Sequence, residues 1–168
     1  QVFNDTLYVS LGFGAGDYIW KRTLANVWSQ DDDVQLGYMA VWKERLWAQK
    51  STTQNGVTTN NGVQGCANDP MAAADWTSNG PIVGDPGTPI TSLGALADML
   101  YVGKYDGLHG VDASAIAPLL TPELRPYRDA NNCRNMVAWH GRWFVPHLRG
   151  LLVYQDLGQQ GFLITDST

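Results

Sequence analysis

Histidines and carboxylates are the residues of this chain that could carry out acid–base or hydrolytic chemistry. There are three histidines, His109, His140 and His147, and sixteen acidic residues. Hydrolysis needs two paired carboxylates, or a nucleophile beside a base. The acidic residues are instead dispersed and fall mostly in turns, where Asp commonly bonds its own backbone. No nucleophile-elbow, zinc-protease, phosphate-loop or dinucleotide motif is present in the sequence, so we expect no catalytic residue and no cofactor.

Two pairs of side chains are the best candidates for contact with a ligand. His147 and Arg149 lie in one connection at the end of an expected strand, where they could meet an anion. A hydrogen-bonded surface loop is the alternative for this pair. Trp28 and Trp76 lie outside the repeated positions described below, and their rings could stack on a carbohydrate.

The one dense run of charge, formed by Asp31, Asp32 and Asp33, is a candidate metal site. Three adjacent carboxylates could hold a hard cation such as calcium. Calcium loops, however, usually alternate their ligands and place a glycine at the turn. A solvated turn is therefore the alternative interpretation of this run.

The composition indicates an all-β protein and excludes several functional classes. Charged residues make up only 16% of the chain, against about 25% in typical domains, and aromatic residues and turn formers are frequent. The net charge of −5 and the lack of a basic run exclude nucleic-acid binding. No apolar run of about 18 residues occurs, so we expect no membrane span. Cys66 and Cys133 are expected as free thiols, with one long-range disulfide as the alternative in an extracellular protein.

The elements that would position these residues are repeated along the chain. Four short phrases, DTLYVS, ERLWAQ, DMLYVG and GRWFVP, share one pattern. Their third residues, here called the anchors, are Leu7, Leu46, Leu100 and Trp143. The residue after each anchor is aromatic: Tyr8, Trp47, Tyr101 and Phe144. A bulky residue stands four positions before each anchor: Phe3, Trp42, Leu96 and Trp139.

Each repeat predicts a small antiparallel sheet. A strand, a polar turn of two or three residues, a second strand, a glycine-containing turn and a third strand follow one another. Weaker fourth strands are expected near residues 27–28, 74–76 and 162–164. Residues 54–89 are expected to form a long inserted loop, because Asn, Gly, Thr and Pro are frequent there. Thr121 and Pro122 predict one helical turn, with Thr121 as its cap.

A repeat of about 40 to 50 residues with three or four strands predicts a β-propeller of about four blades. One such sheet has two apolar faces, and radial stacking buries each face against a neighbouring sheet. We therefore expect the anchors, the aromatic residues after them and three of the four preceding bulky residues (Trp42, Leu96 and Trp139) to pack between blades. The expected blades are residues 1–33, 34–88, 89–131 and 132–168, in a single complete or partial propeller.

The third repeat is similar to a known type of blade. The segments Ile90-Thr91-Ser92-Leu93, Leu100-Tyr101-Val102-Gly103, Asp106-Gly107-Leu108 and Val111-Asp112 resemble the regulator-type β-propeller repeats. The fourth repeat is similar, and the chain also resembles repeat proteins among the structural genes of tailed bacteriophages. This resemblance implies the fold, but it says little about activity, since one fold hosts many functions.

The first repeat begins at its turn, so its first strand is short of residues that the other repeats have. We therefore expect the chain to be a piece of a larger propeller, or one that completes its first blade from a partner. A four-bladed ring closed within one chain is the alternative. The chain begins at Gln1, which indicates a processed protein or a fragment.

These observations lead to three functional hypotheses. The first is a non-enzymatic structural or interaction module within a larger assembly, specifically a phage or virion structural protein. Its partners would be other protein chains, including copies of itself, and its location the virion or the extracellular space, with the cytoplasm as an alternative. The second is a carbohydrate-binding or carbohydrate-processing propeller, and the third is the sensor domain of a signalling protein.

Overall fold

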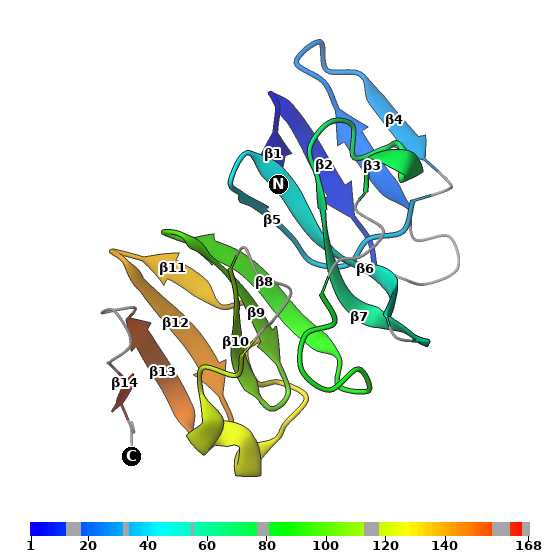
Figure 1. Ribbon diagram of the computed structural model, residues 1–168. Helices are drawn as coiled ribbons and strands as arrows, with labels where there is room; N and C mark the ends of the chain where they lie inside the picture. The colour runs from blue at the N-terminus through cyan, green and yellow to red at the C-terminus, as the bar shows by residue number, and fades with distance from the viewer. Residues whose placement is uncertain are drawn as a thin grey trace. The chain divides into compact units, whose positions relative to one another are not determined.

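The computed structural model describes residues 1–12, 18–31, 34–54, 56–76, 81–112, 118–155 and 162–165. The described residues form an all-β protein with four small antiparallel sheets (Figure 1). The chain divides into two compact units, Gln1–Ile82 and Val83–Thr168, and each unit contains two sheets. Among the described residues there is no helix long and apolar enough to cross a membrane.

The first unit contains strands β1 to β7. Its first sheet has the order β1-β2-β3-β4, with bounds Val2–Phe3, Thr6–Ser10, Ile19–Arg22 and Trp28–Asp31. Its second sheet has the order β5-β6-β7, with bounds Met39–Trp42, Arg45–Gln54 and Val57–Cys66. A short 3-10 helix, η1, spans Ala73–Asp75.

The second unit contains strands β8 to β14. Its first sheet has the order β10-β9-β8, with bounds Gly107–Val111, Met99–Lys104 and Ile90–Leu96. Its second sheet has the order β11-β12-β13-β14, with bounds Val137–Trp139, Arg142–His147, Gly150–Gln155 and Phe162–Thr165. A 3-10 helix, η2, spans Pro122–Tyr127. Each of the four sheets falls within one of the four segments expected from the repeat.

The four sequence repeats share one hairpin geometry. In every sheet the first two strands are joined by two residues, and the closing pairs are Phe3↔Thr6, Trp42↔Arg45, Leu96↔Met99 and Trp139↔Arg142. Both turn residues have positive φ in three of these hairpins, for example 47° and 57° at Lys43 and Glu44. Positive φ at both positions defines the type I′ turn, whose twist matches that of antiparallel strands. The four anchors therefore occupy one structural position, directly after the second-strand residue of the pair that closes each turn.

Strand alternation gives each sheet two distinct faces. We call the face that carries the anchor the anchor face. The opposite face is the aromatic face, because it carries the aromatic residue that follows the anchor. The pairing registers also place the bulky residue before each turn on the aromatic face, as Phe3 lies opposite Thr6 and in line with Tyr8.

The core of the first unit lies between its two sheets. The aromatic face of β1–β4 contributes Phe3, Tyr8 and Ile19. The anchor face of β5–β7 contributes Leu46, Ala48 and Cys66. All six are at most 5% exposed, so this sheet pair removes its apolar side chains from water, which is the main favourable contribution to folding.

The core of the second unit repeats this arrangement. The aromatic face of β8–β10 contributes Tyr101 and Leu108, and the anchor face of β11–β14 contributes Trp143, Val145 and Leu152. The rings of Tyr101 and Trp143 lie with their centroids 5.3 Å apart, at the tilted geometry that aromatic pairs favour. In both units, an aromatic face thus packs on the anchor face of the next sheet along the chain.

Burial of the repeated positions is mostly as expected, with one exception. Trp139 is 62% exposed, so no sheet of its own unit covers it, and its packing between sheets stays a prediction. It lies on the aromatic face of β11–β14, on the side of that sheet away from its buried Trp143. The other positions are buried or partly buried: Leu7, Tyr8, Trp42, Leu46, Trp47, Leu96, Leu100, Tyr101, Trp143 and Phe144.

Two expectations for residues 54–89 are wrong. This segment is not all loop, because β7 pairs with β6 on both sides of a register shift between Lys50 and Thr52, and the two strands form the longest hairpin of the described residues. Gln54 pairs with Val57, and Gly56 between them has a φ of 78°. The Asn-Gly pair at this turn is a strong hairpin signal that the loop-like composition obscured. Residues 74–76 do not form the expected strand either, because η1 occupies Ala73–Asp75; only Trp76 pairs, in an isolated antiparallel bridge with Cys66 at the end of β7.

The other local expectations are confirmed in their position. The weak strands near residues 27–28 and 162–164 are β4 and β14. The helical turn after Thr121 is η2, with Pro122 at its start. Thr121 does not cap it, however. Its Oγ1 instead accepts a hydrogen bond from the backbone N–H of Leu108 at 2.9 Å, which joins the turn to β10.

Candidate functional site

The most prominent surfaces are the two sheet faces that no core covers. One is the anchor face of β1–β4, which carries Val2, Leu7, Val9, Trp20, Arg22 and Trp28. The other is the aromatic face of β11–β14, which carries Val137, Trp139, Arg142, Phe144, Pro146, Leu151 and Val153. We call them the β1–β4 outer face and the β11–β14 outer face. Each is the reverse side of a sheet whose other side forms a core.

Both outer faces expose large apolar side chains. On the β1–β4 outer face, Val2 is 63% exposed and Trp28 is 49% exposed. On the β11–β14 outer face, Val137 and Trp139 are 57% and 62% exposed, and Leu151 is also exposed. The Trp139 ring contacts Phe144 on the same face, with centroids 5.9 Å apart. Contiguous apolar groups on a protein surface commonly mark interaction sites.

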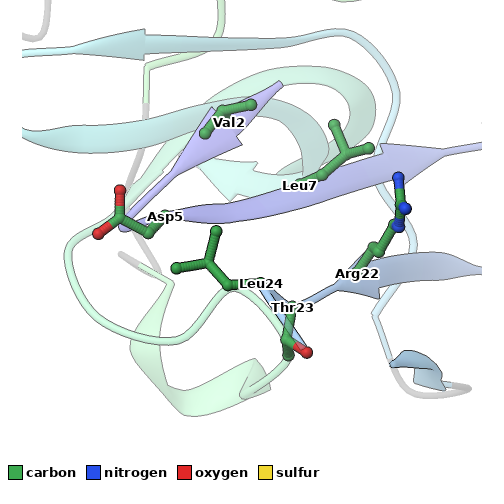
Figure 2. Close-up of a pocket in the computed structure, with 6 residues that line it drawn as sticks. All are labelled: Val2, Asp5, Leu7, Arg22, Thr23 and Leu24. Atoms are coloured by element: carbon green, nitrogen blue, oxygen red, sulfur yellow. The ribbon is translucent and has the colours of Figure 1, made fainter. Parts of the chain in front are cut away.

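The β1–β4 outer face contains a hollow of about 320 Å³ (Figure 2). Its lining combines apolar, charged and hydroxyl side chains from β1 to β3 and the turns beside them: Val2, Asp5, Leu7, Arg22, Thr23 and Leu24. Figure 2 shows Leu24 reaching from the turn after β3 towards the β1–β2 hairpin. Arg22 is fixed at this rim by a hydrogen bond of 2.6 Å from its Nε to Asn26 Oδ1.

Among the predicted ligand residues, His147 and Arg149 lie in one hairpin but present their polar groups differently. His147 ends β12 and is buried, and its Nδ1 accepts a hydrogen bond from the backbone N–H of Arg149 at 3.1 Å. Burial lowers the pKa of His147, and the nearby Arg149 charge lowers it further, while Asp129 opposes this shift. The Arg149 guanidinium lies 4.8 Å from the centre of the Tyr127 ring. The pair therefore forms a hydrogen-bonded hairpin with a neutral imidazole, which is a poor anion site.

The two candidate stacking residues differ in burial. Trp28 lies on the β1–β4 outer face, half exposed, with the Arg22 guanidinium 5.8 Å from its ring centre. Trp76 is 5% exposed, and its Nε1 donates a hydrogen bond of 3.1 Å to the Pro70 carbonyl. Trp76 belongs to the core of the first unit. Trp28 is thus the candidate whose ring a ligand can reach.

The predicted metal site is only partly placed. Asp31 ends β4, whereas Asp32 and Asp33 lie outside the described residues. Within the described ranges there is no group of three or more His, Cys, Asp or Glu side chains placed to hold a metal ion. Both cysteines are free and buried, Cys66 in the first unit and Cys133 in the second.

A buried polar cluster in the second unit escaped prediction. Lys104 is fully buried at the end of β9, and its Nζ donates hydrogen bonds to the carbonyls of Val83 and Asp85 at 2.5 and 2.6 Å. Burial lowers the pKa of Lys104 to about 8, although Asp106 and Asp85 oppose the shift. The Asp106 and His109 side chains approach to 3.5 Å beside it.

The buried cluster around Lys104 has a structural role. Both bonds of Lys104 go to backbone carbonyls, and they hold the start of the second unit against the β9–β10 hairpin. A Cβ added at Gly84 would lie 2.7 Å from the His109 ring, so the chain passes close over that imidazole. The signal in the sequence is a single lysine in the apolar strand MLYVGK, in the same repeat position as His147.

The outer-face residues Val2, Val137 and Leu151, and Leu24 in the turn beside the hollow, also escaped prediction. The signal was available, because strand alternation about each anchor assigns every residue of a hairpin to one face. What alternation does not give is which face has a covering sheet. No protein-family model matches the sequence, and no similar sequence is found among curated proteins.

Proposed function

We propose that this protein is a non-enzymatic interaction module, a β-propeller-type stack of small sheets that serves as a platform in a larger assembly. The observation that carries this proposal is the pair of exposed apolar outer faces, on sheets whose opposite faces are buried in cores. The ordered sheet-on-sheet packing within each unit supports the propeller architecture. The polar cluster around Lys104 supports a non-enzymatic role, because the amine of Lys104 donates its hydrogen bonds to backbone carbonyls.

The specific setting that we propose is a phage or other virion particle, where the module would contact other structural chains. Its support is the resemblance of the chain to repeat proteins among the structural genes of tailed bacteriophages, together with the low content of charged residues. Such a role requires stable contacts between chains rather than a catalytic centre. Both outer faces offer the aromatic residues that dominate the energetics of protein interfaces.

Hydroxyl-radical footprinting of the isolated chain and of particles purified from its source tests this function. We expect oxidation of Trp139 and Trp28 in the isolated chain, diluted until it is monomeric, and at least about tenfold lower oxidation of one of them in the particle. Tyr38, which is exposed and lies on neither outer face, is the internal control. Absence of the chain from particles would remove the virion setting. Equal oxidation of both tryptophans in the two samples would remove the interaction function.

A carbohydrate-binding role is the second candidate, because one observation favours it. Trp28 is exposed beside Arg22, which lines the hollow together with Asp5 and Thr23. An aromatic ring next to charged and hydroxyl groups suits a sugar. A glycan array probed with the native chain and with Trp28→Ala tests this role. Binding that Trp28→Ala abolishes would support it, and an array without binding would reject it.

A further inference from the structure

The two outer faces correspond to the two sides of the sheet-to-sheet contact that forms each core. Within each unit, the aromatic face of one sheet packs on the anchor face of the next. In the first unit Tyr8 faces the sheet of Leu46, and in the second Tyr101 faces the sheet of Trp143. The β11–β14 outer face is an aromatic face, and the β1–β4 outer face is an anchor face.

Residues in the completed contacts differ sharply in burial from their counterparts on the outer faces. Phe3 is 5% exposed, whereas Trp139, at the same position of its hairpin, is 62% exposed. Leu46 is completely buried, whereas its counterpart Leu7 is partly exposed and lines the hollow. Within its own unit, each outer face therefore lacks the contact that buries the same positions elsewhere.

From this we infer that the β11–β14 outer face of one copy of this chain packs on the β1–β4 outer face of a second copy, head to tail. The inference rests on the proposed interaction function and names its partner. A second copy carries the matching face in the form that the chain already uses twice within itself. The proposed contact uses the same packing of an aromatic face on an anchor face that forms the two cores.

The side chains of the two outer faces are complementary in size. The largest exposed ring of the β11–β14 outer face is Trp139, and the β1–β4 outer face has a hollow with apolar side chains from Val2, Leu7 and Leu24. Arg142 pairs with Trp139 across the hairpin, and the lining of the hollow offers it Asp5 as a partner beside the like charge of Arg22. We therefore expect Trp139 to contribute most of the binding free energy of the contact, as central aromatic residues of interfaces commonly do.

Because the two faces differ, the association is heterologous. Head-to-tail contacts either close into a ring or grow into an open chain, depending on the rotation between copies. A ring of two copies would contain two identical contacts, each between one β11–β14 outer face and one β1–β4 outer face. Blocking a single face should therefore prevent rings and chains alike.

Sedimentation velocity with two blocking variants tests the inference. Trp139→Arg blocks the β11–β14 outer face, and Val2→Arg blocks the β1–β4 outer face, both at exposed positions that leave the cores intact. We expect the native chain to associate with rising concentration, and each variant alone to remain at the monomer mass of 18.4 kDa. The loss of affinity should be at least about 30-fold for each.

A mixture of the two variants is the decisive sample. Each variant retains the face that the other lacks, so an equimolar mixture should form a one-to-one dimer that grows no further. Leu148→Arg is the matched control, because Leu148 is 61% exposed at the β12–β13 turn and lies on neither outer face. This control should associate as the native chain does.

Three results would overturn the inference. A native chain that is monomeric while hydroxyl radicals readily oxidise Trp139 has no self-contact. A native monomer with Trp139 protected has closed the contact within one chain. If Trp139→Arg abolishes association and Val2→Arg leaves it intact, two β11–β14 outer faces contact each other. Protection of Trp139 in particles, together with any of these results, would leave the proposed interaction function standing with a different partner.

Discussion

At the scale of single residues, Lys104 links stability to pH. The folded protein holds its pKa near 8 by burial, against an ordinary value of 10.5. Between these two pH values the unfolded chain binds a proton that the folded chain does not. The free energy of unfolding should therefore rise as pH increases from about 8 to 10.5, and the destabilising effect of the charged amine is fully present below pH 8.

We predict that this pH dependence disappears in Lys104→Met. The native protein should gain stability relative to the variant by on the order of 3 kcal/mol over that interval. Urea unfolding of both proteins at intervals from pH 7.5 to 10 measures the difference, and the tyrosines that titrate in this range are common to both. Parallel stability curves would show that Lys104 keeps an ordinary pKa in the folded state.

Gly94 is the residue that admits the Trp143 ring between the sheets of the second unit. A Cβ at this position would lie 2.3 Å from Cη2 of that ring, so the indole would have to move. We predict that Gly94→Ala lowers the free energy of unfolding by about 1–3 kcal/mol, as overpacking in a core does. Gly87→Ala is the control, because its nearest neighbour would be at 3.4 Å and the loop is exposed. Equal stability of both variants, measured by urea unfolding, would contradict this role.

At the scale of elements, the four hairpins share a two-residue turn whose first residue has a positive φ, which costs free energy for any residue other than glycine. Ala97, in the β8–β9 turn, has a φ of 51°, where a Cβ is crowded by the backbone. The turn keeps this conformation because the sheet pairing on both sides determines it. Glycine has no such cost, and the position is exposed.

We predict that Ala97→Gly raises the free energy of unfolding by about 1 kcal/mol. Ala95→Gly, two residues earlier in β8, should instead lower it by about 0.5–1 kcal/mol, because glycine gains freedom in the unfolded chain. Thermal unfolding of the two variants and the native protein separates these effects. The expectation fails if both substitutions destabilise the protein equally.

At the scale of the whole molecule, each unit holds one buried thiol that reports on its opening. Cys66 and Cys133 lie in the cores of the first and second unit, and both are fully buried. Burial raises the pKa of Cys66 and raises that of Cys133 to about 12. Since the thiolate is the reactive form, labelling requires the unit to open first.

We predict that Ile19→Ala speeds labelling of Cys66 by a thiol reagent at least about 30-fold. The substitution removes a fully buried side chain from the same core, at a typical cost of 2–5 kcal/mol. Leu24→Ala, at an 85% exposed position, is the control and should leave the rate unchanged. Rapid labelling of Cys66 in the native protein would contradict its place in the core.

The sequence by itself determined the local structure of this protein. The spacing of the anchors gave four hairpins in one register, because strand alternation and two-residue turns depend on neighbouring residues alone. It also indicated the all-β class and most of the buried positions. It misjudged β7, where a loop-like composition hid a strand that its pairing with β6 stabilises.

The tertiary structure decided which of the repeated positions are buried. Phe3 and Trp139 have equivalent places in their hairpins, yet a neighbouring sheet covers the first and leaves the second in solvent. Likewise, no local pattern separates the buried Trp76 from the exposed Trp28, or predicts that Lys104 is held by distant carbonyls. Burial depends on which sheet lies opposite, and that is a property of packing between segments distant in the sequence.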